Sequence, residues 1–143
     1  MKSKKHIETL KHGVAAQIAA SNPKSSVWVS ANAGTGKTRV LVDRISRLLL
    51  MGTPASKILC LTFTKAAAGE MALRLNERLG KWAATKKELL RDQLSVLLAR
   101  PPSNDELDYA QQLFASTIDS PDGLRIRTIH SFCESLLGRF PLE

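Results

Sequence analysis

A loop of small and polar residues near the start of the chain joins a short apolar stretch to an amphipathic one. It spans residues 31–38 and reads ANAGTGKT. Gly34 and Gly36 let the backbone bend without Cβ clashes, so that backbone N–H groups can point at an anion. Lys37 stands where an ammonium reaches the outer phosphates of a nucleotide, and Thr38 stands where a hydroxyl completes the coordination of Mg²⁺. These residue types at this spacing predict a phosphate-binding loop.

The usual form of such a loop is GxxxxGK[ST], and Ala31 takes the place of its first glycine. The departure is small, because alanine is the least bulky residue that has a Cβ. The residues expected to contact ATP phosphates are Ala31, Asn32, Ala33, Gly34, Thr35, Gly36, Lys37 and Thr38. Lys37 and Thr38 are also the candidate catalytic residues, with Thr38 as the Mg²⁺ ligand. The alternative is a flexible glycine turn with a solvent-exposed lysine.

Such a loop needs a strand before it and a helix after it, and its flanks predict both. VWVS, residues 27–30, is a short β-rich run. Apolar residues then recur at helical spacing until Gly52 and Pro54 stop the helix. The residues expected on one face of this helix are Leu41, Ile45, Leu48 and Leu49.

The pattern is then repeated. KILCLTFT, residues 57–64, is a continuous apolar run rich in β-formers, which predicts a strand buried on both faces of a parallel sheet. The residues expected on one face of the helix after it are Met71, Leu75, Leu79 and Trp82. Strand, helix, strand and helix at this spacing predict an α/β fold with a parallel sheet flanked by helices.

The segment after Trp82 differs, because it is rich in leucine and has no strand pattern. We expect a helical insertion over residues 83–120, with two helices divided by RPPSND. SPDG then predicts a turn, LRIRTI a third strand, and HSFCESLLGRF a third helix. The residues expected on one face of this last helix are Phe132, Leu136 and Phe140. The chain thus divides into residues 1–82, the insertion, and residues 121–143.

Composition indicates one globular domain. The chain has 143 residues, of which 43% are hydrophobic and 24% charged, enough to bury a core. Cys60 and Cys133 lie in apolar segments, so we expect reduced core cysteines of a cytoplasmic protein. We find no signal peptide and no stretch long enough to span a bilayer.

The net charge of +8 is unevenly distributed. Residues 1–82 hold 14 Lys/Arg against 4 Asp/Glu, whereas residues 83–143 hold 7 against 9. The basic part contains the glycine loop, and its charge suits nucleic acid or nucleotide phosphates. Solvated helix faces are an equally good explanation of the charge alone.

The second strand narrows the class of protein. ILCLTFTKAAAGEMALRL, residues 58–75, resembles motif Ia of superfamily 1 helicases of the UvrD/Rep type. The resemblance implies that Thr62, Phe63, Thr64 and Lys65 contact the backbone of single-stranded DNA. Hydroxyls, a lysine and a helix N-terminus bind phosphate without reading sequence, and an exposed Phe63 can stack a base. Alternatively, Phe63 lies in the core and Lys65 caps a surface turn.

The third strand adds to this resemblance. RTIHSFCESLL, residues 127–137, is similar to motif Ic of the same family, which implies DNA contacts by Thr128, His130 and Ser131. Two structural roles compete with this interpretation. Ser131 and Glu134 have the spacing of a helix capping box, and a single histidine is often a hydrogen-bonded structural residue.

Two further residues are candidates for binding adenine. Gln17 lies 20 residues before Lys37, about where these helicases carry a glutamine whose amide can donate one hydrogen bond to adenine and accept another. Arg39 stands where relatives can stack a guanidinium on the base. A glutamine on the surface of a helix is the alternative for Gln17.

Within this group the chain most resembles the AddA family, the helicase-nuclease subunits of double-strand break repair, in their alphaproteobacterial form. The resemblance covers residues 10–143 and implies the N-terminal part of a RecA-like domain 1A of a P-loop NTPase. It also implies ATP with Mg²⁺ as cofactors and single-stranded and double-stranded DNA as partners. The remaining helicase and nuclease domains and an AddB-like second subunit would be the protein partners.

Hydrolysis also needs an acidic pair at a strand end and an arginine near the transferring phosphate. The adjacent pair Asp105 and Glu106 follows PPSN and starts a helix, so it is not the required motif. We therefore expect an N-terminal piece of a longer ATP-dependent DNA helicase, inactive alone and able to bind nucleotide and DNA weakly.

Two other functions stay open at this point. One is a small P-loop phosphotransferase whose insertion acts as a lid, with Arg91 and Arg100 as its candidate arginines. The other is a nucleic-acid-binding module that has a relict glycine loop and no enzymatic activity.

Overall fold

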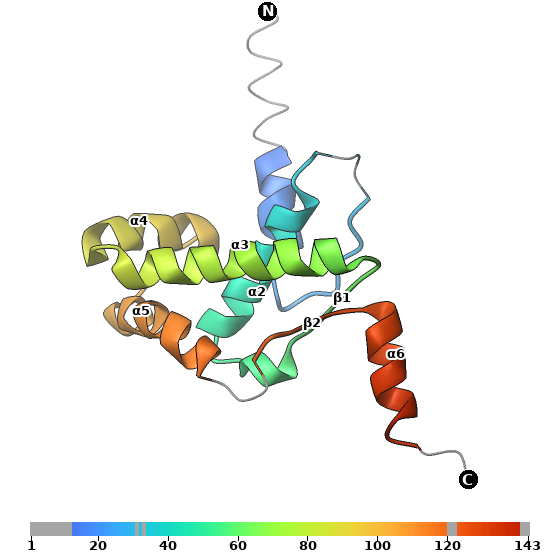
Figure 1. The fold of residues 1–143 in the computed structure, drawn as a ribbon. Helices are drawn as coiled ribbons and strands as arrows, with labels where there is room; N and C mark the ends of the chain where they lie inside the picture. The colour runs from blue at the N-terminus through green and yellow to red at the C-terminus, as the bar shows by residue number, and fades with distance from the viewer. Residues whose placement is uncertain (1–12, 31, 33, 120–122, 141–143) are drawn as a thin grey trace, which may run out of the picture.

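A computed structural model describes residues 13–30, 32, 34–119 and 123–140 (Figure 1). Residues 13–20 are helical and precede the glycine loop. The elements that follow are α2 (Lys37–Leu50), a short 3₁₀ helix η1 (Ala55–Lys57), β1 (Leu59–Thr62), α3 (Lys65–Ala84), α4 (Lys87–Leu98), α5 (Asn104–Ile118), β2 (Arg125–Thr128) and α6 (Ile129–Leu137).

The sheet of the described residues has two strands. β1 and β2 pair in parallel, with Leu59 opposite Arg125 and Thr62 opposite Thr128. Three helices, α3, α4 and α5, connect the two strands, as a parallel pair requires a long crossover. The expected parallel pairing of the second and third strands is confirmed.

A helical layer forms the core. Figure 1 shows α3 crossing the molecule, with α4 and α5 packed along its distant half and α6 at the other end. The expected face of α3 is confirmed, since Met71, Leu75, Leu79 and Trp82 are all buried. Leu90 and Leu94 of α4 and Leu107, Ala110 and Leu113 of α5 belong to the same hydrophobic cluster. The insertion therefore shares its core with α2 and α3.

Side-chain caps define where three of the helices begin. Thr64 accepts a hydrogen bond from Ala67 N at the start of α3, at 3.1 Å. Ser103 and Glu106 form a full capping box at the start of α5. Thr128 caps α6 by accepting from Ser131 N at 3.2 Å. The expected capping box of Ser131 and Glu134 is therefore wrong, because the strand ends one turn earlier and its last threonine takes the N-cap position.

The expected strand at residues 27–30 is also wrong. The segment is extended but joins no ladder, and the side chain of Trp28 is 92% exposed. A β-rich sequence becomes a strand only where a neighbouring strand accepts and donates its backbone hydrogen bonds. In the sheet that the described residues form, β1 and β2 bond to each other and not to this segment.

The helix after the loop matches its prediction except at one position. α2 ends at Leu50, and Gly52 follows with a φ of 81°. Ile45 and Leu49 are buried and Leu48 is half-buried, but Leu41 is exposed. Val42 takes its place in the core because it lies three residues before Ile45, on the side that faces α3.

The sheet is open on one side, which the sequence does not predict. Cys60 and Thr62 face the helices, whereas Leu59 and Leu61 on the other face are 44% and 43% exposed. The expectation of a strand buried on both faces is wrong for this part of the chain. An apolar run shows that a strand can be buried on both faces but not which elements cover it.

The last helix is the least buried element. No residue of α6 is buried, Leu136 and Phe140 are exposed, and Phe132 is half-buried. Cys133 is exposed, so the expected core position is wrong for this cysteine, while Cys60 is half-buried. The expected SPDG turn lies mostly outside the described residues. Among the helices that the structure describes, none is long and apolar enough to cross a membrane.

Candidate nucleotide and DNA site

The glycine loop has the backbone geometry that its glycines permit. Gly34 has a φ of 79° and Gly36 a φ of 88°, both in the left-handed region. Any other L-residue would pay about 1–2 kcal/mol at each of these positions. Gly36 is also the N-cap of α2 and offers no side-chain cap, so the first N–H groups of the helix keep their donors for another acceptor.

One carbonyl organises the loop. The oxygen of Asn32 accepts from Lys37 Nζ at 2.6 Å and from Thr35 Oγ1 at 2.7 Å. Lys37 thus reaches back across the loop from the first turn of α2, and its ammonium lies beside the N-terminus of that helix. An anion placed there would meet this ammonium together with the backbone donors of the helix. Ala31 and Ala33 lie outside the described residues.

The first turn of α2 holds no acidic residue that would compete with an anion. Thr38 lies in this turn and is half-buried. The described part of the chain has no cluster of His, Cys, Asp or Glu that could hold a metal ion. Mg²⁺ is commonly held by phosphate oxygens, water and few protein ligands, so a single hydroxyl such as that of Thr38 fits this chemistry.

The segment before the loop is fixed to α2 by two arginines. Arg44 donates to the carbonyls of Asn22 and Ser25 at 2.6 and 2.7 Å, and Arg47 donates to Ser21 Oγ at 3.0 Å. Burial lowers the pKa of the Arg47 guanidinium. These bonds hold the helical residues 13–20 against α2, next to the loop.

Gln17 is placed at the loop by this arrangement. Its Nε2 donates to the carbonyl of Thr35 at 3.4 Å, and a Cβ on Gly36 would lie 3.4 Å from the same nitrogen. Gln17 and Arg39 line one cavity of about 410 Å³, which also contacts α3 and α4. The structure thus brings together the two residues that the sequence proposes for adenine.

Arg39 belongs to a charge network that sequence reasoning missed. Asp43 lies within 3.9 Å of Arg39 Nε and also pairs with Arg78 of α3. Arg78, Trp82 and Asp43 line the same cavity as Arg39. The helical spacing of Arg39 and Asp43 gives a signal for their contact, but nothing in the sequence indicates that Arg78 joins them.

The ends of β1 and β2 lie at one edge of the sheet. Thr62 and Thr128 face each other in the parallel register. Thr62 is buried, and its hydroxyl donates to the carbonyl of Thr64 at 3.0 Å, so it supports the turn. Phe63 is 84% exposed, which excludes the core position considered for it. Lys65 opens α3 and is also exposed.

The second strand end has a matching layout. Thr128 uses its hydroxyl to cap α6, and Ser131 Oγ donates to the carbonyl of Thr128 at 3.3 Å. His130 lies in the first turn of α6 with an exposed side chain. Two helix N-termini, an exposed aromatic ring, a lysine and a histidine therefore lie near one edge, and each can contact a phosphate or a base without reading sequence.

The acidic pair before α5 has a structural role. Arg100 forms a bidentate pair with Glu106, at 2.9 and 2.5 Å, and Glu106 accepts from Ser103 N at 2.8 Å. The hydrogen bond from Arg100 is the main cause that lowers the pKa of Glu106 to about 2. The expectation that this pair starts a helix is confirmed.

The comparison with protein families gives the class of the chain. It belongs to the UvrD/REP helicase family, whose N-terminal domain model matches residues 13–142. No solved structure gives a significant match.

Curated relatives share one name, that of an ATP-dependent helicase/nuclease subunit. The relative from Lactobacillus johnsonii is 38% identical over 114 residues, which are 80% of this chain and 8% of that protein. Its counterpart in Lactobacillus gasseri is 40% identical over the same shares. That of Latilactobacillus sakei is 33% identical over 129 residues, 87% of this chain and 12% of that protein. The chain thus spans about a tenth of the length of these relatives.

Proposed function

We propose that the chain forms the N-terminal, ATP-binding part of the RecA-like domain 1A of an ATP-dependent DNA helicase-nuclease, working in the cytoplasm in double-strand break repair. The observation that carries the proposal is the glycine loop at the start of α2. Gly34 and Gly36 are both left-handed, the helix has no side-chain cap, and Lys37 reaches across the loop to Asn32. Family membership and the shared name of the relatives support it.

In this proposal the loop binds the phosphates of Mg-ATP. The backbone donors of residues 31–38 and the ammonium of Lys37 contact the phosphate oxygens, and Thr38 completes the coordination of Mg²⁺. Gln17 and Arg39 contact adenine from the adjacent cavity. Bound ATP would supply the free energy of hydrolysis, for which these residues provide binding and orientation.

The strand ends bind single-stranded DNA. Thr64, Lys65, His130 and Ser131 contact backbone phosphates, and the exposed ring of Phe63 stacks on a base. Thr62 and Thr128 position this edge through their bonds to the turn and to α6. In the parent protein, ATP-driven closure against a second RecA-like domain would alternately tighten and loosen these contacts, which moves the protein along one strand. Duplex unwinding, a nuclease domain and an AddB-like partner belong to that parent.

The arrangement of the insertion disfavours the phosphotransferase alternative. A lid needs arginines that can reach a substrate, but Arg91 donates to Asn104 Oδ1 at 2.7 Å and Arg100 is paired with Glu106. Both side chains hold the α4–α5 connection together, and α4 and α5 share the main core.

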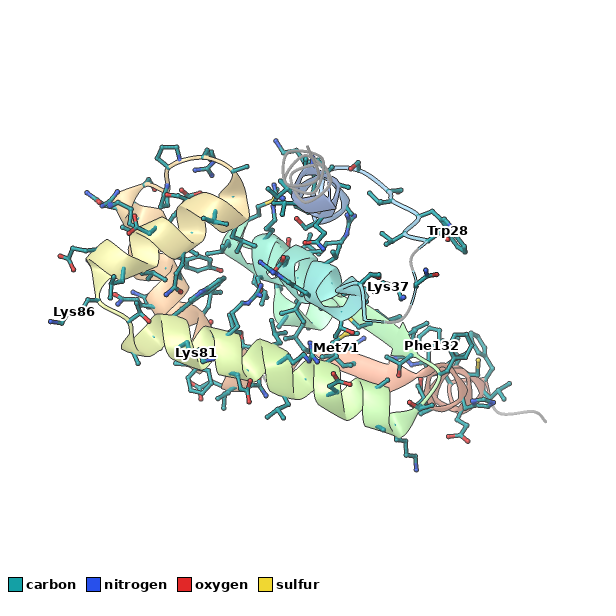
Figure 2. All side chains as sticks on the ribbon, turned by 90° about the horizontal axis from the view of Figure 1, so that it is seen from above. Trp28, Lys37, Met71, Lys81, Lys86 and Phe132 are labelled. Atoms are coloured by element: carbon teal, nitrogen blue, oxygen red, sulfur yellow. The ribbon has the colours of Figure 1, made fainter. Side chains whose placement is uncertain are left out.

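The test is nucleotide binding by the isolated chain, measured with a fluorescent ATP analogue and Mg²⁺. Lys37→Ala should weaken binding at least tenfold, about 1.4 kcal/mol, with an unchanged melting temperature. Lys86→Ala, at the far end of the molecule, is the matched control (Figure 2). Equal affinity of the Lys37 variant and the native chain would refute the proposed phosphate site.

A further inference from the structure

Arginine pairing divides the chain in two. The arginines between residues 39 and 100 all donate to, or pair with, a carboxylate, carbonyl or hydroxyl of the protein. They are Arg39, Arg44, Arg47, Arg74, Arg78, Arg91 and Arg100. The three arginines that follow, Arg125, Arg127 and Arg139, all line one pocket. This pocket shares no residue with the cavity that contains Gln17 and Arg39.

The pocket lies between the open face of the sheet and α6. Its volume is about 290 Å³. Arg125 and Arg127 lie opposite Leu59 and Leu61 in the parallel register, so their side chains leave the same, exposed face of the sheet. Phe132 of α6 forms part of the facing wall.

The polar lining consists of hydrogen-bond donors. Lys57, at the end of η1, and Arg139, just past α6, complete a set of four cations with the two β2 arginines, and Ser56 and Ser135 add hydroxyls. No carboxylate of the described residues lines the pocket, and within that part of the chain Lys57, Arg127 and Arg139 form no ion pair. Since Lys and Arg side chains carry no acceptor, the complementary occupant is rich in acceptor oxygens and negatively charged.

We propose that this pocket, lined by Lys57, Arg125, Arg127 and Arg139, binds a phosphate group of a nucleotide or a nucleic-acid strand, as a second anion site separate from the glycine loop. The cations come from three directions, namely η1, β2 and the end of α6. A phosphate presents oxygens in several directions around one centre, whereas a carboxylate presents two in one plane. The half-buried ring of Phe132 adds a surface on which a base or sugar can pack.

The probe is a short fluorescein-labelled oligothymidylate, titrated with the isolated chain at several salt concentrations and followed by anisotropy. Arg127→Gln and Arg139→Gln should each weaken binding by about threefold to tenfold at low salt. Each should also reduce the slope of log K against log salt by about one. Lys86→Gln removes the same charge at the opposite end of the molecule from Phe132, and should change neither quantity (Figure 2). Far-UV circular dichroism verifies that the variants are folded.

Two further arms separate this pocket from the proposed function and identify the source of the phosphate. Lys37→Ala should leave the effect of Arg127→Gln on oligothymidylate binding intact, even where ATP binding is lost. Competition by inorganic pyrophosphate that depends on Arg127 would show that a free phosphate suffices, and competition by oligothymidylate alone would show that a strand is needed. The proposal is overturned if both arginine variants bind like Lys86→Gln. It is also overturned if polyglutamate binds the pocket more tightly than oligothymidylate, which would make it a surface for acidic polypeptide.

Discussion

The helical half of the chain and its open half satisfy their side chains in opposite ways. In α2 to α5, leucines such as Leu75 and Leu79 are fully buried, and the arginines are bonded to protein acceptors. In the glycine loop, the strand ends and α6, apolar side chains such as Trp28 and Phe63 are exposed, and helix N-termini and cations face outward. Stability therefore resides in the first half, and the groups able to bind phosphate reside in the second.

The difference shows how one small chain can carry a binding edge. Exposed donors and strained glycines cost folding free energy, and they persist only when another part of the structure supplies a surplus. The shared core of α2, α3, α4 and α5 is the surplus here. Three predictions test this division, beginning with the largest expected effect.

Loss of a core side chain should break the helical half. Leu79→Ala removes a fully buried side chain from the middle of α3, which should reduce the free energy of unfolding by about 2–5 kcal/mol. Leu73→Ala, on the same helix but 59% exposed, should cost less than about 0.5 kcal/mol. Urea unfolding followed by circular dichroism measures both. Should Leu79→Ala fail to fold, Leu79→Met must still fold with a loss below about 1.5 kcal/mol; equal effects at Leu73 and Leu79 would contradict the assignment of the core.

Glycine-to-alanine substitutions should have opposite signs in the two halves. Gly36→Ala forces an L-residue to a φ of 88° and should destabilise the chain by about 1–2 kcal/mol, with weaker nucleotide binding. Gly69→Ala lies within α3 with open space at its Cβ and should stabilise by about 0.5–1 kcal/mol. Thermal melts of the two variants provide the comparison. A stabilising Gly36→Ala would show that the loop does not need its left-handed backbone.

The same division separates what could be predicted from the sequence from what could not. Helix faces in the core, such as Met71 to Trp82, follow from local periodicity, because each helix buries its own apolar stripe. The outcome at residues 27–30 and at β1 depends on which strands and helices lie beside them, and periodicity does not contain that information. The loop residues could be predicted because spacing alone defines the motif. The bond between Arg78 and Asp43 could not, since it joins two helices.

The smallest of the three predicted effects concerns the pair that holds the insertion together, and it depends on pH. Glu106 has a pKa of about 2, below its ordinary value of 4.5, because Arg100 and the N-terminus of α5 favour the carboxylate. A lowered pKa contributes stability that is present above the ordinary value and is lost as the pH falls from about 4.5 toward 2. Since Arg100 is 55% exposed, solvent screening reduces the contribution to about 1 kcal/mol. The unfolding free energy of Glu106→Gln should therefore fall less over this pH range than that of the native chain, whereas Glu88→Gln, in the first turn of α4, should retain the native profile. Parallel profiles for Glu106→Gln and the native chain would mean that the insertion owes its stability to its buried leucines alone.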